Sequence, residues 1–199
     1  MPDTAPLNDS ASGRLVPAAA AALLVVDVQE RLVPALVDAG RLLRSVALLV
    51  EAAHRLGVPT VVTEHCPQQI GHTVPDLDRL LGHAVKVEKT HFSAAHEPGF
   101  APVMQAWRRR TVFLCGAEGH VCVAQTALGL ADAGHRVAVV ADAVGARHRD
   151  DTAIAIQRLV QAGIVPCSVE MVITEWLRDA ASPEFKPLLQ AIKARHAQR

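Results

Sequence analysis

The feature that most constrains the fold is a glycine that recurs between a helical pattern and an apolar run. It occurs three times, at Gly57, Gly134 and Gly163. Glycine accepts the left-handed backbone that ends many helices, so each position predicts a helix C-terminus directly before a strand. The apolar runs predict strands at residues 21–26, 58–63, 84–88, 111–116, 136–141 and 164–168. This alternation predicts an α/β fold, a three-layer, doubly wound, Rossmann-like sheet of about six parallel strands with helices on both faces.

Helical periodicity fills the segments between the predicted strands. The predicted helices include residues 41–56, 151–162 and 187–197. The chain has 199 residues, half of them hydrophobic, which suits one domain with a sizeable core. We expect a single domain over residues 18–199 and a flexible N-terminal tail over residues 1–17, because the chain start is rich in small and polar residues without periodicity.

The charges of the chain balance, with 20 Lys and Arg against 20 Asp and Glu. Such a balance favours a small-molecule substrate and argues against a nucleic acid or an anionic membrane as partner. The apolar run at residues 17–26 is too short to span a bilayer and lacks the basic segment of an export signal. Four cysteines without paired metal spacing predict neither a disulfide framework nor structural zinc. We therefore expect a cytoplasmic protein.

One cysteine stands where thiols act as nucleophiles. Residues 115–123, with the sequence Cys-Gly-Ala-Glu-Gly-His-Val-Cys-Val, follow an apolar strand, and apolar steps of three and four begin a helix near His120. The unpaired N–H groups and the positive dipole end of such a helix favour the thiolate of Cys122. A buried and inert cysteine is the alternative that this segment alone leaves open.

Two charged residues follow other predicted strands. Asp27 comes directly after the apolar run 19–26, and Lys89 follows the alternating segment 84–88. The carboxyl ends of parallel strands line the ligand crevice of an open α/β sheet, so an acid, a base and a thiol could converge there. Taken singly, Asp27 could instead cap the following loop, and Lys89 could be a solvated charge.

Four motifs in this order resemble the isochorismatase-like cysteine hydrolase family. They are Val-Asp-Val-Gln at 26–29, Glu-Lys-Thr-His-Phe-Ser at 88–93, Gly-Ala-Glu-Gly-His-Val-Cys-Val at 116–123 and Ala-Asp-Ala-Val at 141–144. The resemblance extends over roughly residues 18–195. It is strongest to the isochorismatase domain-containing subgroup, whose members carry Thr-Glu-Gln where this chain has Thr63-Glu64-His65.

The resemblance implies a catalytic triad of Asp27, Lys89 and Cys122. Lys89 would favour the thiolate, and Asp27 would take the thiol proton and later hand it to a leaving amine, through a thioester acyl-enzyme. The family uses main-chain N–H groups for the oxyanion, here those of Cys122 and Glu118, and a cis peptide that would fall between Ala117 and Glu118. The implied activity is hydrolysis of a small-molecule carbon–nitrogen bond, without cofactor, in a homo-oligomer.

Further residues of the matched motifs are expected to line the substrate pocket. These are Gln29, His65, Phe92 and His120. A functional metal is not expected, because Glu64 and His65 are adjacent and side chains of neighbours in an extended segment diverge. Residues 63–75, which are rich in Pro and Gly, predict a long loop that shapes specificity.

A polar group after the fifth predicted strand stays outside the catalytic set. It consists of Asp142, Arg147 and His148. These residues could form a cluster at the pocket rim, but helix capping by Asp142 and a surface ion pair explain them equally well.

Two other functions remain open for the sequence. One is hydrolysis of the vinyl ether of isochorismate, a reaction that does not need a thiol nucleophile. The other is a non-catalytic or redox-sensing protein that uses Cys122 for oxidation or partner binding. The presence of Asp27 and Lys89 favours catalysis, since a sensor needs only a low thiol pKa.

Overall fold

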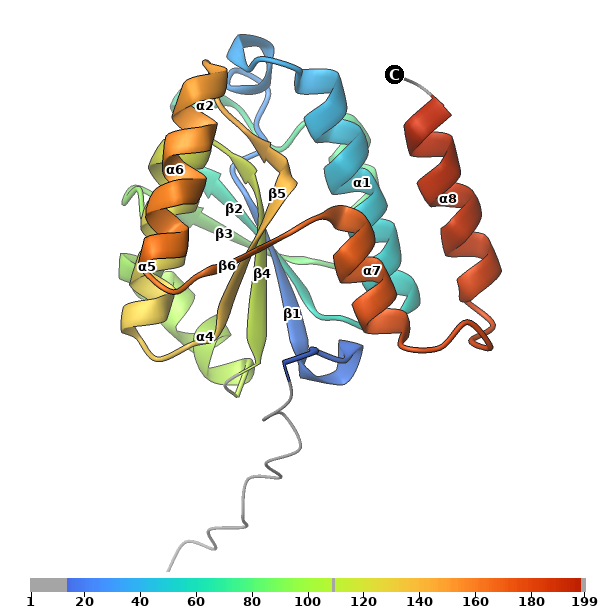
Figure 1. Cartoon of the computed structure of the whole chain (residues 1–199). Coiled ribbons are helices and arrows are strands. Elements are labelled where there is room, and N and C mark those ends of the chain that lie inside the picture. The colour runs from blue at the N-terminus through green and yellow to red at the C-terminus, as the bar shows by residue number, and fades with distance from the viewer. Residues whose placement is uncertain (1–13, 109, 198–199) are drawn as a thin grey trace, which may run out of the picture.

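The fold is built on one six-stranded parallel sheet, seen in a computed structural model that describes residues 14–108 and 110–197. The sheet has the order β3-β2-β1-β4-β5-β6 (Figure 1). The strands are β1 (Ala21–Val26), β2 (Thr60–His65), β3 (Val85–Lys89), β4 (Thr111–Ala117), β5 (Val137–Gly145) and β6 (Val165–Cys167). All strand pairs in the sheet are parallel, which confirms the predicted α/β class.

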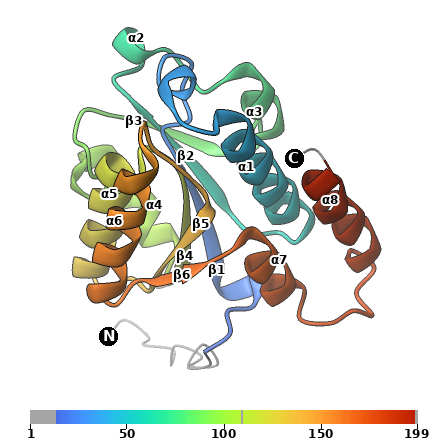
Figure 2. The same cartoon turned by 45° about the horizontal axis from the view of Figure 1, so that its top comes forward.

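Helices cover both faces of the sheet, as predicted. They are α1 (Ala39–Arg55), α2 (Pro67–Ile70), α3 (Pro75–Leu80), α4 (Ala101–Ala106), α5 (Ala124–Asp132), α6 (Arg149–Gln161), α7 (Val169–Leu177) and α8 (Phe185–Ala197). Figures 1 and 2 show α1, α7 and α8 on one side of the sheet and α4, α5 and α6 on the other. None of the helices in the described part of the chain is long and apolar enough to cross a membrane.

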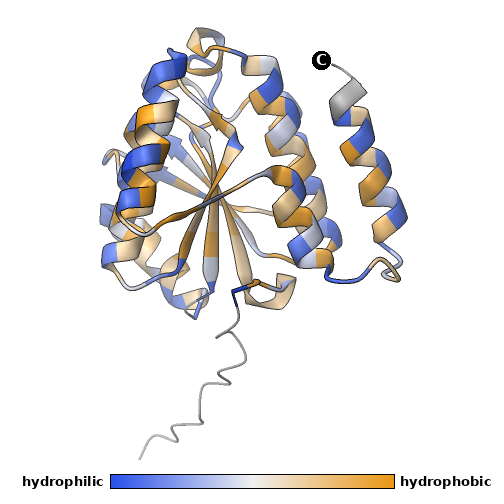
Figure 3. Ribbon diagram, viewed as in Figure 1, coloured by the Kyte–Doolittle hydropathy of each residue, from blue (hydrophilic) through white to orange (hydrophobic). Residues whose placement is uncertain are grey.

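Strand β1 divides the core into two apolar layers. All six of its residues are buried. Leu23 and Val25 pack into the layer under α1 and α7, whereas Leu24 and Val26 pack into the layer under α5. Side chains alternate along a strand, so a fully apolar run fills both faces of a covered parallel sheet. Figure 3 shows apolar strands in the middle of the molecule and polar outward faces on the helices.

The second strand starts two residues later than predicted. The N–H of Val58 donates to Ala53 O at the end of α1, so Val58 still belongs to the helix terminus. Pro59 has no N–H to contribute to a strand ladder. Pairing with β1 therefore includes Thr60, opposite Leu23, and β2 runs on to His65. The predicted loop over 63–75 is shorter for this reason, and it contains the one-turn helix α2.

Asp142 lies within β5 and not after it. The ladder between β4 and β5 is shifted between Leu114 and Gly116, which makes room for extra residues in β5. The Asp142 carboxylate accepts the N–H of Val169 at 2.8 Å, at the start of α7, and pairs with Arg195 at 2.6 Å. Asp142 thus caps the start of α7, which is one of the two roles that the sequence left open.

The ordered domain begins before the predicted boundary at residue 18. Val16 is buried in the core, and its N–H donates to Glu175 Oε1 at 2.6 Å. The expectation of a flexible tail is therefore wrong for Val16, because its side chain packs under α7. Residues 1–13 of that predicted tail lie outside the described residues.

Gly116 allows β1 and β4 to approach closely. Its φ is +120°, and a Cβ added there would lie 2.1 Å from Val26 O. Because that oxygen belongs to the main chain of a central strand, no side-chain movement can relieve the contact.

We predict that Gly116→Ala lowers the free energy of unfolding by about 3 kcal/mol, through backbone strain and the clash with Val26. The matched control is Gly99→Ala, whose added Cβ meets nothing within 4 Å. Urea unfolding of both variants measures the difference. Equal stability of the two variants would contradict the role given to Gly116.

Candidate active site

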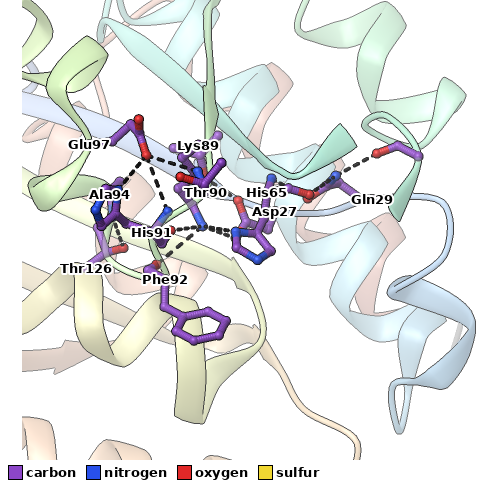
Figure 4. A network of polar contacts seen from close by, with 12 residues as sticks. Asp27, Gln29, His65, Lys89, Thr90, His91, Phe92, Ala94, Glu97 and Thr126 are labelled. Carbon is purple, nitrogen blue, oxygen red and sulfur yellow. Dashed lines mark hydrogen bonds and ion pairs between the residues drawn. The ribbon is translucent and has the colours of Figure 1, made fainter. Parts of the chain in front are cut away.

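Three elements of the sheet bring the predicted triad together. Asp27 follows β1, Lys89 ends β3, and Cys122 lies in the turn between β4 and α5. All three stand at the carboxyl edge of the sheet, where parallel strands leave their ligand crevice. Strand β2 separates β1 from β3, so Asp27 and Lys89 meet across its end (Figure 4).

Asp27 and Lys89 form a buried ion pair. Lys89 Nζ lies 2.7 Å from Asp27 Oδ2, and both side chains are 0% exposed. The second carboxylate oxygen accepts the hydroxyl hydrogen of Thr63 at 2.6 Å. Lys89 also donates to the main-chain oxygens of His91 at 3.2 Å and Phe92 at 3.3 Å. These contacts hold both charged groups in one place.

Cys122 completes the arrangement as a neutral thiol. Its side chain is buried, and the charges of Asp27 and Lys89 both act on its pKa. Burial and then the charge of Asp27 raise the pKa of the thiol to about 12, against the opposing effect of Lys89. The raised pKa favours the protonated thiol over the preformed thiolate that the sequence analysis expects. The thiol keeps its proton, and a carboxylate lies beside it.

The turn that carries Cys122 is irregular. The expected helix start near His120 is a π-helical turn over Gly119–Val123, and the α-helix begins only at Ala124. The peptide bond between Ala117 and Glu118 is cis. The main-chain oxygen of Glu118 accepts the N–H groups of Val121 and Val123, each at 3.1 Å, so the turn closes on itself.

His65 and Phe92 lie together beside Lys89. His65 Nδ1 is 3.5 Å from Lys89 Nζ, and the rings of His65 and Phe92 are 5.3 Å apart. Phe92 is half exposed, whereas His65 is partly buried. Burial and the charge of Lys89 lower the pKa of His65, so the ring is neutral at pH 7.

The side chain of His120 interacts with α6. Its Nε2 lies 3.8 Å from Asp151 at the start of α6, and its Nδ1 is buried without a hydrogen-bond partner among the described residues. Nearby, Arg147 pairs with Glu118 at 2.7 Å across the same turn, the surface ion pair considered in the sequence analysis. His120 therefore links the turn that carries Cys122 to α6.

Gln29 has no amide atom left for a substrate. Its Oε1 accepts the N–H of His65 at 2.7 Å, and its Nε2 donates to the main-chain oxygens of His65 at 3.0 Å and Gly71 at 2.6 Å. The side chain is fully buried. Gln29 therefore positions the end of β2, and with it His65, and its place in the substrate pocket stays a prediction.

Glu64 is a second positioning residue that the sequence analysis missed. Its buried carboxylate accepts the N–H and the hydroxyl of Thr73, each at 2.7 Å, and pairs with His72 at 2.9 Å. These bonds lower the pKa of Glu64 despite the opposing effect of burial. Among the described residues no group of three His, Cys, Asp or Glu could hold a metal.

A surface cavity of about 650 Å³ lies elsewhere at the same edge, between the starts of α1 and α6. Arg41, Gly145 and Arg149 contribute to its lining, and the triad residues do not. Arg41 donates to Asp142 O and Arg149 pairs with Asp38, so both cations already have protein partners. The cavity is separate from the candidate site.

Comparison with known proteins places the chain in one family. Residues 21–171 match the isochorismatase domain. Isochorismatase domain-containing protein 1 of Salmo salar is 34% identical over 92% of this chain, and the chain spans 64% of the length of that relative. The secreted isochorismatase effector Isc1 of Phytophthora sojae is 37% identical, with 91% of this chain and 88% of the relative covered.

The fold matches as well. The structure of MAR1 ribonuclease from Caenorhabditis elegans superimposes with a TM-score of 0.84, at 33% identity, over 91% of this chain and 93% of the other. The domain match spans most of the chain and includes the strand ends that carry Asp27, Lys89 and Cys122. The chain therefore belongs to the isochorismatase domain family.

Proposed function

We propose that the chain is a cysteine hydrolase that cleaves a small-molecule carbon–nitrogen bond of the amide type. One observation carries the proposal: the buried thiol of Cys122 is close enough to both members of a buried ion pair, Asp27 and Lys89, for each to act on its pKa. Removing two charges from water costs several kcal/mol per ion, so the pair is poorly explained by stability alone. A nucleophile beside a base and a fixed cation is the arrangement that acyl transfer requires.

The proposed reaction has two steps. Cys122 Sγ bonds to the substrate carbonyl carbon while its proton passes to Asp27, and the N–H groups of Cys122 and Glu118 stabilise the oxyanion. Collapse breaks the carbon–nitrogen bond, and Asp27 returns the proton to the leaving amine. Water then adds to the thioester, Asp27 accepts its proton, and the carbon–sulfur bond breaks to give the acid and the free thiol.

Two alternatives are weaker for specific reasons. Oxidants attack exposed thiolates, whereas Cys122 is 6% exposed and protonated at rest, which disfavours a redox sensor. Hydrolysis of isochorismate would leave the thiol without a role. Isochorismate should be assayed beside the amide, because a relative carries the name secreted isochorismatase effector.

We predict that Cys122→Ala lowers the turnover of a chromogenic amide such as 4-nitroacetanilide to background, a loss of at least about a thousandfold. The alanine variant should melt within a few degrees of the wild type. Cys167→Ala is the control, since Cys167 is a free cysteine in β6, at the far end of the strand order from β3, and should leave turnover unchanged. An alanine variant that still cleaves the amide would overturn the nucleophile, and cleavage of isochorismate alone would favour the vinyl ether reaction.

We predict that Lys89→Met destabilises the fold by about 3 to 5 kcal/mol, because it leaves the Asp27 carboxylate buried without its cation. Adding Asp27→Asn to Lys89→Met removes that charge and should recover a large part of the loss. Thermal or urea unfolding measures Lys89→Met, Asp27→Asn and the double variant. A double variant whose loss equals the sum of the single losses would show that the two side chains are not coupled.

We also propose, from the sequence resemblance, a cytoplasmic homo-oligomer. One chain has a mass of 21.2 kDa. Light scattering should therefore give a small whole-number multiple of that mass, and a strictly monomeric protein over a hundredfold concentration range would contradict the oligomer.

A further inference from the structure

The loop of residues 90–97 holds the ammonium group of the candidate site. It follows β3, and its main-chain oxygens at His91 and Phe92 accept hydrogen bonds from Lys89 Nζ at 3.2 and 3.3 Å. Glu97 closes the loop, because its Oε2 accepts the N–H of His91 and pairs with the ring of the same residue. The loop is therefore a compact unit, and its position affects the position of the ammonium group.

A side-chain hydrogen bond joins this loop to helix α5, which follows the turn that carries Cys122. The N–H of Ala94 donates to Thr126 Oγ1 at 3.0 Å, and both residues are 0% exposed (Figure 4). A buried N–H that loses its acceptor is destabilising, because no water replaces the acceptor. The bond thus connects the loop that holds Lys89 to the helix that follows the thiol.

The loop and α5 also approach closely at Gly129, three residues after Thr126 on the same helix. A Cβ added at Gly129 would lie 2.8 Å from Ser93 Oγ and 3.0 Å from Ala95 Cβ. Carbon atoms in contact lie about 3.5 to 4.0 Å apart, so a side chain at this position would push the loop away from the helix. Glycine weakens a helix interior, so the close approach explains this glycine better than helix propensity does.

We propose that Thr126 and Gly129 are positioning residues, which fix the loop of residues 90–97 against α5 and so keep the ammonium group beside the thiol. The inference rests on the proposed function, because this position matters to turnover only if Cys122 is the nucleophile. Lys89 is the group that opposes the raised pKa of the thiol. A displaced ammonium group would therefore leave the thiol harder to ionise.

The hydrogen bond can be tested without turnover. Thr126→Val keeps the shape of the side chain and loses the acceptor, so iodoacetamide should label Cys122 about threefold to tenfold more slowly at pH 8. Mass spectrometry of the peptide that carries Cys122 measures the rate. Thr126→Ser keeps the hydroxyl and should label at the wild-type rate. The control is Thr60→Val, which removes a buried hydroxyl bonded to Val58 O at the opposite edge of the sheet.

The close contact is tested by rescue. Gly129→Ala should slow the labelling of Cys122 and lower kcat for 4-nitroacetanilide, each by about threefold to tenfold, because the loop carries the ammonium group away. Ser93→Ala removes the oxygen nearest to the added Cβ, so the double variant should recover part of both losses. Without the contact, Gly129→Ala would only strengthen α5 and leave both rates unchanged.

The outcomes separate the two proposals. Labelling of Cys122 that is as fast as in the wild type or faster in Thr126→Val, or equally slow in Thr60→Val, overturns the positioning role and leaves the cysteine hydrolase in place. A wild type that cleaves no amide, with labelling still slowed in Thr126→Val, overturns the hydrolase and keeps the link between loop and thiol. If Thr126→Val does not fold, Gly129→Ala with and without Ser93→Ala decides the question.

Discussion

The buried contact between Asp27 and Lys89 is the interaction on which the candidate site depends. The two residues come from strands that are not neighbours, since β2 lies between β1 and β3. Neighbouring strands are about 4.8 Å apart, so the main chains of β1 and β3 are separated by roughly twice that distance. The short Asp27 side chain contacts the Lys89 ammonium only because the lysine side chain is long. The pair therefore forms only when three strands hold their register.

The end of β2 is held by side chains that have no part in the proposed chemistry. Gln29 bonds to both main-chain groups of His65, and Thr63 bonds to the Asp27 carboxylate. Buried Glu64 holds the return of the chain at Thr73. Each of these polar groups has a hydrogen-bond partner. This is the condition under which a buried polar network makes its surroundings rigid. The precision of the site thus comes from polar residues one step behind the triad.

The sequence was sufficient for the layers of the fold, because Gly57, Gly134 and Gly163 mark helix ends and the strands between them are apolar. It also predicted, through spacing and resemblance, that Asp27, Lys89 and Cys122 meet at one edge of the sheet. It could not identify the roles of Gln29 and Glu64, because these depend on which loop each side chain faces. Strand ends such as that of β5 were missed because a ladder irregularity is set by the neighbouring strand and not by local composition.

Two cysteines show what local pattern cannot determine. Cys115 and Cys122 are seven residues apart, and burial raises the pKa of both thiols. The thiol of Cys115 donates to the main-chain oxygen of Leu24, with 3.8 Å between Sγ and O. Cys122 instead faces a carboxylate and an ammonium group. The difference between a core cysteine and a candidate nucleophile therefore lies in its partners and not in its burial.

These partners also explain how a thiol with a raised pKa could react. At rest the buried site holds one negative charge on Asp27 and one positive charge on Lys89. If the thiol proton passes to Asp27, the negative charge moves to Cys122 and the total is unchanged. Creating an isolated thiolate in a buried site would cost several kcal/mol, whereas moving a charge between two partners of the same cation avoids most of that cost. Lys89 is thus the fixed counter-ion for both states, and this is why its position, more than the pKa of the free thiol, determines whether the site can act.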